Sequence, residues 1–206
     1  MIGYLILAVL VAFIAVVAIR TIRFRPKPQP EVTKEEIAFD HDAAVDSLAQ
    51  LVRCKTVSYN DHSLEDEGEF QKLSLLPTLY PNVFGTCTFQ QLPDRALLLR
   101  WPGKQEGDPA VMMAHYDVVP VNEEKWDKPP FAGVIEGGIL WGRGTLDIKE
   151  QVFGVLEAAE YLLARGRTFR RTAYLAFGDD EETLNLGAKA ISDHLKAQGV
   201  TLEFAL

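Results

Sequence analysis

Residues 2–19 form an unbroken run of uncharged, overwhelmingly apolar side chains. A helix rises about 1.5 Å per residue, so a run of this length just crosses a hydrocarbon core about 30 Å thick. Basic residues follow at once, and a proline-rich stretch comes directly after them. The pattern predicts a transmembrane anchor over residues 1–19, a basic, Pro-rich stalk over residues 20–36 and one folded domain over residues 37–206.

The alternative to an uncleaved anchor is a cleaved signal peptide, which would send the protein out of the cell. A signal peptide has a basic start, a shorter apolar region and small residues before the cut. Here the start carries only its α-amino charge, and Ala18, the candidate cleavage position, is followed closely by arginines. We therefore expect a single-pass anchor. The basic residues behind it favour a cytoplasmic domain, but single anchors often break this rule, so the side of the membrane stays open.

The charge balance of the chain excludes one class of partner. Four of its 21 basic residues precede residue 29, in a stretch that has no acidic residue, so residues 29–206 hold 17 basic and 29 acidic side chains. Such a surface repels phosphate backbones, and we expect no nucleic-acid partner. The two cysteines, Cys54 and Cys87, are too few for a disulfide framework and are interpreted as core residues.

Beyond the stalk, amphipathic helical segments alternate with short apolar segments typical of strands. Asp40 is placed to cap a helix that runs through Val52, and a second helical face is expected to end at Pro77. Residues 110–114 are continuously apolar, which is typical of a strand buried on both faces. Further strands are predicted over residues 84–90, 96–100, 172–177 and 200–206, and further helices over residues 150–165 and 186–198, with Gly166 and Gly199 as their stops. This alternation predicts an α/β domain with a mostly parallel sheet and helices on both faces.

In such sheets, ligands gather beyond the C-terminal ends of the strands, and the first polar cluster there contains His115 and Asp117. Residues two apart in an extended strand share a face, so both side chains can point the same way. A metal-binding histidine usually donates its other ring N–H to a carboxylate, which Asp117 could supply. Taken alone, however, His-x-Asp is more often a structural hydrogen-bonded pair than a site.

The second cluster is the glycine-rich turn at residues 142–149, which carries Asp147. A carboxylate has two oxygens and can bridge two cations, but on spacing alone Asp147 is an N-cap for the helix that follows. The third cluster is the acidic run at residues 179–182. Its four carboxylates would repel one another in a cleft unless cations or protons compensate. The alternative is the acidic first turn of a helix, which the helix dipole favours.

Glu181 and Glu182 offer two roles from neighbouring positions, because one can bind a metal ion while the other acts as general base on a water. A strand-end histidine, an aspartate after a glycine turn and a strand-end Glu pair occur here in one order, and this combination is more specific than its parts. Mixed histidine and carboxylate ligands suit Zn²⁺, with Co²⁺ or Mn²⁺ as substitutes.

At these residues the chain resembles the peptidase M20 family of zinc aminoacylases and carboxypeptidases, in particular the branch of carboxypeptidase S and the N-acyl-amino-acid hydrolases. The resemblance covers the chain from residue 37 to its end. It is carried by LVRCKTVS (51–58), MAHYDVVP (113–120), WDKPPF (126–131), GILWGRGTLDIK (138–149) and FGDDEE (177–182).

The resemblance implies a role for each matching residue. His115 would bind one metal ion, Asp147 would bridge two, and Glu182 would bind the other. Glu181 would be the catalytic general base, and Asp117 would support His115 in catalysis. The family further implies two Zn²⁺ ions per complete site, hydrolysis of the amide of a peptide or an N-acyl amino acid, and a dimerisation domain that would make the full-length protein a homodimer.

The chain also departs from the family pattern. Ile148 follows the bridging aspartate, residues 183–185 replace the usual small residues after the Glu pair, and Cys54-Lys55 replaces an Ile-Pro type pair. A further metal-binding acid and a distant histidine of the family have no counterpart in these 206 residues. We therefore expect an N-terminal fragment that is inactive alone. The alternatives to a carboxypeptidase or aminoacylase are a deamidase or dipeptidase on the same scaffold, and a non-catalytic, membrane-tethered remnant or binding module.

Overall fold

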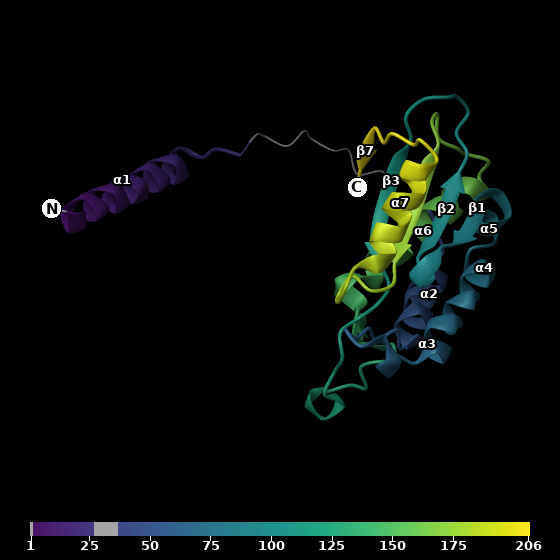
Figure 1. Ribbon diagram of the computed structural model, residues 1–206. Coiled ribbons are helices and arrows are strands. Elements are labelled where there is room, and N and C mark those ends of the chain that lie inside the picture. Colours follow the sequence, from purple (N-terminus) through teal and green to yellow (C-terminus); the bar gives the residue numbers. More distant parts are fainter. Residues whose placement is uncertain (1, 27–36) are drawn as a thin grey trace. The chain divides into compact units, whose positions relative to one another are not determined.

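The computed structural model describes residues 2–26 and 37–206 (Figure 1). The chain divides into two units, Met1–Ala38 and Phe39–Leu206, and each is described by itself. The second unit holds every strand found in the described part of the chain, together with all of the predicted site residues.

The described part of the first unit contains helix α1 (Ile2–Arg23), whose side chains are all exposed. An 18-residue window of α1 has a mean hydropathy of 3.0, so the helix is apolar enough to cross a membrane or to serve as a signal sequence. It continues past residue 19 and has Arg20 and Arg23 in its last turn. Residues 27–36 of the predicted stalk lie outside the described residues.

A five-stranded sheet forms the centre of the second unit, in the order β1-β2-β6-β3-β7 (Figure 1). β2 pairs antiparallel with both β1 and β6, whereas β3 pairs parallel with both β6 and β7. Four of the five strands therefore run in one direction, and the prediction of a mostly parallel sheet is confirmed. The strands are β1 (Thr88–Gln91), β2 (Leu97–Trp101), β3 (Ala110–His115), β6 (Ala173–Gly178) and β7 (Phe204–Ala205), and β4 (Val134–Glu136) and β5 (Ile139–Trp141) form a separate hairpin.

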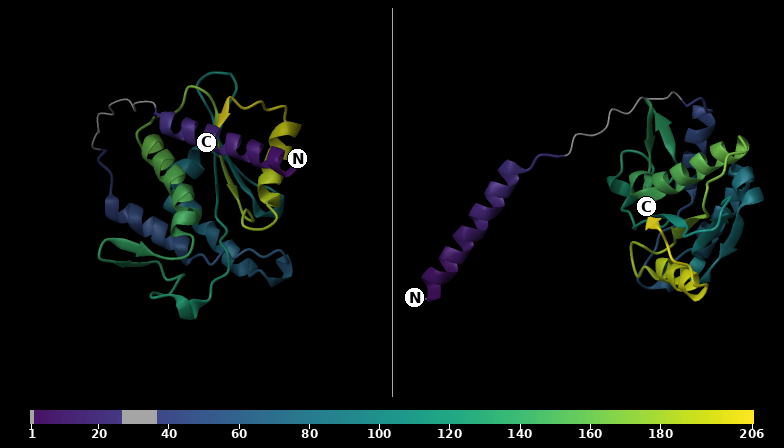
Figure 2. Two further views of the ribbon diagram at one scale, coloured as in Figure 1. Left: turned by 90° about the vertical axis from the view of Figure 1, so that its left-hand side faces the viewer. Right: turned by 90° about the horizontal axis from the view of Figure 1, so that it is seen from above.

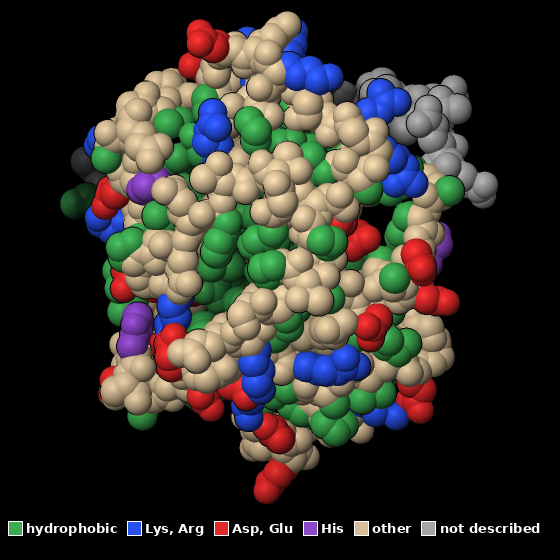
Figure 3. Space-filling view, turned by 90° about the vertical axis from the view of Figure 1, so that its right-hand side faces the viewer, with side chains coloured by type: hydrophobic (Ala, Val, Ile, Leu, Met, Phe, Trp, Pro, Cys, Tyr) green, Lys and Arg blue, Asp and Glu red, His purple; other side chains and the backbone are tan. Residues whose placement is uncertain are grey.

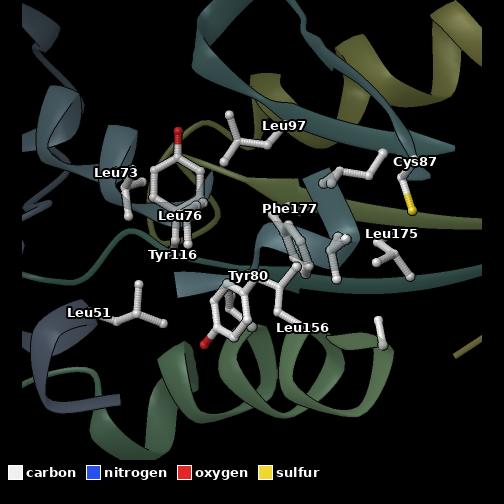
Figure 4. Close-up of a cluster of buried hydrophobic side chains, with 14 of the residues drawn as sticks. Leu51, Leu73, Leu76, Tyr80, Cys87, Leu97, Tyr116, Leu156, Leu175 and Phe177 are labelled. Carbon is white, nitrogen blue, oxygen red and sulfur yellow. The ribbon is translucent and has the colours of Figure 1, made fainter. Parts of the chain in front are cut away.

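Helices cover both faces of this sheet, as predicted (Figure 2). One face packs against α2, α5 and α6, and Figure 4 shows Leu156 of α6 pointing toward Phe177 of β6. The other face packs against α7 through Ile191 and Leu195. The helices are α2 (His41–Arg53), α3 (Glu67–Gln71), α4 (Leu76–Leu79), α5 (Pro81–Thr86), α6 (Glu150–Ala164) and α7 (Leu186–Ala197), with short 3₁₀ turns at His62–Leu64, Lys72–Leu75, Pro93–Arg95 and Glu123–Lys125.

Local signals explain where the long helices begin and end. The Asp40 side chain accepts a hydrogen bond from Ala43 N at 3.0 Å, so the predicted N-cap of α2 is confirmed. After α6, Gly166 adopts φ 66° and Arg167 N donates to Leu162 O at 2.9 Å. A left-handed glycine with this backward hydrogen bond is a common helix stop.

The predicted strand over residues 84–90 is wrong in its first half, which belongs to helix α5. Pro81 stands in the first turn of that helix, where its fixed φ suits the backbone. Val83 is fully buried, and Phe84 packs against the same core, so the helical turn of α5 faces the hydrophobic interior. The prediction that Pro77 ends a helix is also wrong. Pro77 stands in the first turn of α4, where the missing N–H of proline has no intrahelical partner to lose.

The prediction that residues 110–114 are buried on both faces holds only in part. Met113 is 40% exposed, because it lines a hollow of about 350 Å³ beside α7 instead of lying beneath a helix. All residues of the neighbouring strand β6 are buried, as expected for a central strand. Cys54 and Cys87 are free and buried, which confirms their interpretation as core residues.

A larger hollow of about 510 Å³ lies where α4 and α5 meet the outer strand β1. Figure 3, which views this side of the domain, shows hydrophobic side chains gathered in a recess. Its apolar lining includes Phe70, Leu76, Phe84, Phe89 and Leu97. None of the predicted site residues, all of which the structure describes, lines this hollow. His115 and the acidic run instead lie at the ends of β3 and β6.

Candidate metal centre

The ends of β3 and β6 bring two of the predicted clusters together. The strands are adjacent and parallel, with His115 opposite Gly178 in the register. Tyr116 N donates to Gly178 O at 3.0 Å, which extends the pairing by one residue. Residues 179–182 therefore leave the sheet next to Asp117, at the edge where the carboxyl ends of parallel strands meet.

Three side chains from separate segments converge at this edge. His115, Asp147 and Glu182 each offer one ligand atom, and these atoms all lie within 4.8 Å of one another. His115 Nε2 is 3.3 Å from Asp147 Oδ1 and 3.7 Å from Glu181 Oε2, so Glu181 borders the same group. The imidazole is buried, whereas the Asp147 and Glu181 side chains are 69% and 51% exposed. The group is thus open to solvent on one side.

Asp117 joins the two strand ends. It is fully buried, and its Oδ2 accepts hydrogen bonds from Ser58 Oγ at 2.6 Å and from Glu182 N at 3.1 Å. Its Oδ1 accepts from Glu181 N at 3.1 Å and lies 3.2 Å from His115 Nδ1. One carboxylate therefore positions the imidazole and both glutamate backbones, and it leaves His115 Nε2 free to face the converging carboxylates.

Burial and charge perturb several groups at this edge. Burial alone would lower the pKa of His115, but the hydrogen bond and the charge of Asp117 raise it to about 9. Burial acts to raise the pKa of Asp117, yet hydrogen bonds from His115 and Ser58 outweigh burial and lower it. The pKa of Glu182 is raised by burial first and then by the nearby Asp147 carboxylate. The carboxylates of Glu182 and Asp147 therefore lie close enough for one to disfavour the charge of the other.

The donor set fits a divalent cation such as Zn²⁺. One imidazole nitrogen and two carboxylates are ligands that zinc accepts. The ion pairs among the described residues bring no lysine or arginine to Asp147 or Glu182, so a bound cation would relieve their mutual repulsion. The contact of His115 Nδ1 with Asp117 is the arrangement that usually orients a metal-binding histidine.

Asp147 stands on a wide turn, Thr145–Lys149. It does not cap the next helix, the alternative that its spacing left open. Lys149 holds the position before α6, and no side chain accepts a capping hydrogen bond there. Gly144 enters the turn with φ 79°, a conformation that glycine adopts without strain. The turn brings the Asp147 carboxylate to His115 instead of to the helix start.

The acidic run at residues 179–182 divides into two pairs, so its four carboxylates do not share one cleft. Asp179 and Asp180 are fully buried. Asp179 accepts a hydrogen bond from Arg95 Nε at 3.2 Å, and Asp180 accepts from the first two N–H groups of α7 at 2.7 and 2.8 Å. Both are structural acids with partners of their own. Only Glu181 and Glu182 reach the donor group.

Three residues that support the site were not predicted from the sequence. Ser58 donates to Asp117, Arg95 pairs with Asp179, and Lys149 is buried behind the Asp147 turn. Ser58 and Lys149 are the last residues of two stretches that carry the family resemblance. Membership of those stretches was the sequence signal that could have identified both residues. Arg95 lies outside those stretches, and its role depends on a chain crossing that local sequence does not reveal.

A family model and several curated relatives match this chain. The family model described as "Peptidase family M20/M25/M40" matches residues 111–206. The chain is 35% identical over 211 residues to N-fatty-acyl-amino acid synthase/hydrolase PM20D1 of Xenopus tropicalis. This alignment covers 96% of the chain and 40% of the relative. It is 35% identical over 190 residues to probable carboxypeptidase S-like 2 of Dictyostelium discoideum (84% and 36%). Carboxypeptidase S of Saccharomyces cerevisiae is 32% identical over 167 residues (75% and 29%). The chain thus spans 40% or less of the length of these relatives.

Solved structures share the fold at low sequence identity. The M20 family metallo-carboxypeptidase Sso-CP2 of Sulfolobus solfataricus superposes with a TM-score of 0.62 at 17% identity, over 82% of this chain and 37% of that protein. Human carnosine dipeptidase 1 superposes with a TM-score of 0.60 at 16% identity, over 76% and 35%. At these identities the likeness concerns the fold alone, and it agrees with the predicted α/β architecture.

Proposed function

Because the chain belongs to the peptidase M20 family, we propose that it contributes metal-binding residues to a hydrolase that cleaves amide bonds. The observation that carries this proposal is the convergence of His115, Asp147 and Glu182 within 4.8 Å. Since the chain spans only part of the length of its relatives, the activity is proposed for the full-length protein.

The three converging side chains are proposed as ligands of Zn²⁺. His115 would bind through Nε2, since its Nδ1 faces Asp117. Glu182 and Asp147 would each contribute an oxygen, and the strongly exposed Asp147 carboxylate has a second oxygen with which to bridge another ion. When bound, Zn²⁺ supplies Lewis-acid polarisation of the substrate carbonyl and lowers the pKa of water toward about 7.

Glu181 is proposed as the general base. Its Oε2 borders the donor group at 3.7 Å from His115 Nε2, and its side chain is half exposed. Its carboxylate would take a proton from the water that attacks the amide carbonyl and would then pass that proton to the leaving amine nitrogen. Asp117 moves no proton in this scheme. Its hydrogen bonds keep its pKa low, and it positions His115 and the glutamates.

The substrate class is proposed from what the relatives have in common. Their names describe hydrolysis of N-fatty-acyl amino acids and carboxypeptidase action. Both kinds of substrate contain an amide whose nitrogen belongs to a residue with a free carboxylate. We propose this shared chemistry, an N-acyl amino acid or the C-terminal bond of a peptide, as the substrate of the full-length protein. A homodimer of that protein, which the family resemblance implies, stays a prediction.

An uncleaved membrane anchor is proposed for α1. Its length, its mean hydropathy of 3.0 and the basic residues Arg20 and Arg23 in its last turn support an anchor, although a signal sequence shares the first two properties. N-terminal sequencing of the mature protein from the membrane fraction distinguishes the two. An intact start supports the anchor, whereas a new N-terminus just after Ala18 would identify a signal peptide.

The test of the hydrolase compares the full-length protein with its Glu181→Gln and His115→Ala variants. Metal content is measured by mass spectrometry, and hydrolysis of an N-acyl amino acid is followed by the released amine. Glu181→Gln should retain zinc but lose about 10²–10⁴-fold in kcat, the usual contribution of a general base. His115→Ala should lose zinc.

Three results would contradict parts of this proposal. Undiminished turnover by Glu181→Gln removes Glu181 from the role of base. Full zinc content in His115→Ala removes His115 from the ligands. A parent protein that folds and binds zinc but hydrolyses no amide supports the non-catalytic alternative.

A further inference from the structure

We propose that Lys149 is the positioning residue for Asp147, and that its buried ammonium sets the affinity of the donor group for a divalent cation. This inference rests on the proposed metal-binding function. Lys149 follows Asp147 by two residues and is only 1% exposed. A lysine is almost never so deeply buried unless partners compensate its charge. Its partners lie in another segment of the chain, outside the donor group.

The ammonium of Lys149 binds the C-terminal end of α2. Its Nζ donates hydrogen bonds to Leu51 O at 3.0 Å and to Cys54 O at 2.5 Å. These carbonyls belong to the last turn and the C-cap of α2, where the helix dipole concentrates partial negative charge. Leu51 and Val52 are themselves fully buried in the core. Lys149 thus attaches its turn to a helix that the core holds in place.

The backbone of Lys149 closes the turn that carries Asp147. Lys149 N donates to Gly144 O at 2.9 Å, so residues 145–148 form a loop held together at its base. Within the loop, Asp147 has the extended dihedral angles φ −131° and ψ 92°. No hydrogen bond to the Asp147 carboxylate is present among residues 37–206, where its polar contact is His115 Nε2. Its position therefore depends on the turn and, through the turn, on Lys149.

The other two donors have a different support. The His115 ring and the Glu182 backbone are both held by Asp117. Loss of the Lys149 ammonium should therefore displace Asp147 and leave the rest of the donor group in place. Removing a residue that orients a metal ligand typically lowers metal affinity about 10–100-fold. The same loss is expected here, with residual binding by the remaining donors.

The test compares the full-length protein with Lys149→Met, Lys149→Arg and Leu156→Ala. Zn²⁺ affinity is measured by competition with a chromogenic chelator, the coordination geometry by the visible absorption of bound Co²⁺, and stability by melting without metal. Lys149→Met keeps the side-chain length but removes the charge, so affinity should fall about 10–100-fold and the Co²⁺ spectrum should change. Lys149→Arg keeps a cation for the same carbonyls and should retain most of the affinity.

Leu156→Ala is the matched control for general destabilisation. Leu156 is fully buried on α6, and its truncation should lower the melting temperature while leaving Zn²⁺ affinity and the Co²⁺ spectrum unchanged. Parent-like affinity in folded Lys149→Met overturns the positioning role and leaves the metal site standing, whereas a parent protein that binds no Zn²⁺ overturns both. If Lys149→Met does not fold, Lys149→Gln replaces it, and undiminished affinity in that variant also overturns the proposal.

Discussion

The two halves of the donor group are held in different ways. In the strand-end half, His115 and Glu182 are attached to the buried carboxylate of Asp117, which also holds the backbone of the neighbouring Glu181. That half follows from the sheet, because the register of β3 and β6 brings the two segments side by side. In the turn half, Asp147 stands on a loop that one lysine attaches to α2. A change in the strand-end half should therefore reduce both stability and metal affinity, whereas a change in the turn half should mainly reduce affinity.

The largest effect is expected from Asp117→Ala, which breaks the strand-end half. The change leaves the His115 ring and two backbone N–H groups without their acceptor. Removing one partner of a buried charged network usually lowers the free energy of unfolding by about 3–5 kcal/mol. Urea denaturation should show this loss, and Zn²⁺ competition should show a larger loss of affinity than Lys149→Met. The control is Asp127→Ala, which removes an exposed acid. Unchanged stability in Asp117→Ala would contradict the expected difference in stability between the strand-end half and the turn half.

A smaller loss of stability is expected where α7 packs closely against the residues that follow β6. A Cβ added to Gly187 would lie 2.3 Å from Asp179 Oδ1 and 3.2 Å from Asp179 N. Gly187→Ala should lower the free energy of unfolding by about 1–3 kcal/mol, as overpacking does in cores. Gly154→Ala in α6 meets nothing within 4 Å and should raise stability by up to about 1 kcal/mol through helix propensity. Thermal melting compares the two variants. Equal melting temperatures would show that the backbone around Asp179 shifts at little cost to accept the added methyl group.

The pH dependence of stability provides a third comparison, through the buried acid beside the strand-end half. Burial and then the neighbouring Asp180 raise the pKa of Asp179 from 3.8 to about 7, although Arg95 opposes them. The folded state therefore binds the proton more tightly than the unfolded chain, and this contribution to stability is lost as pH rises from about 4 to about 7. Asp179→Asn should reduce the stability change across that window by at least about 1.4 kcal/mol, the equivalent of one pKa unit. Urea titrations at several pH values measure it, and an identical pH profile in the variant would contradict the raised pKa.

The smallest effect is expected at a surface ion pair outside both halves. Lys189 and Asp193 pair along α7, and their side chains are 69% and 61% exposed. Exposed pairs of this kind contribute about 0.3–0.5 kcal/mol. Lys189→Ala should therefore change the melting temperature little and Zn²⁺ affinity not at all. A loss of affinity in this variant would show that the assay reports general damage to the fold and not the donor group.

The two halves also differ in how far they could be predicted. The apolar strand segments and the polar residues after them predicted that His115 and Glu182 would meet, because neighbouring parallel strands end at one edge. Asp147 precedes a helix, and its carboxylate could either cap that helix or bind a metal ion. Local sequence does not distinguish these two roles. Asp179 and Asp180 had the same residue types as the ligands, and only their contacts with Arg95 and with the start of α7 separated them from the site.

The sequence by itself determined the long apolar helix, the alternation of the main strands and helices of the sheet, and the residue types able to bind a cation. These properties follow from hydrophobic periodicity and from side-chain chemistry, which are local. Only the tertiary structure decided which acids reach His115, where Lys149 places its charge and which side of β3 stays open. Those outcomes depend on segments far apart in the chain meeting at short range, where burial and hydrogen bonds assign each charged group its partner.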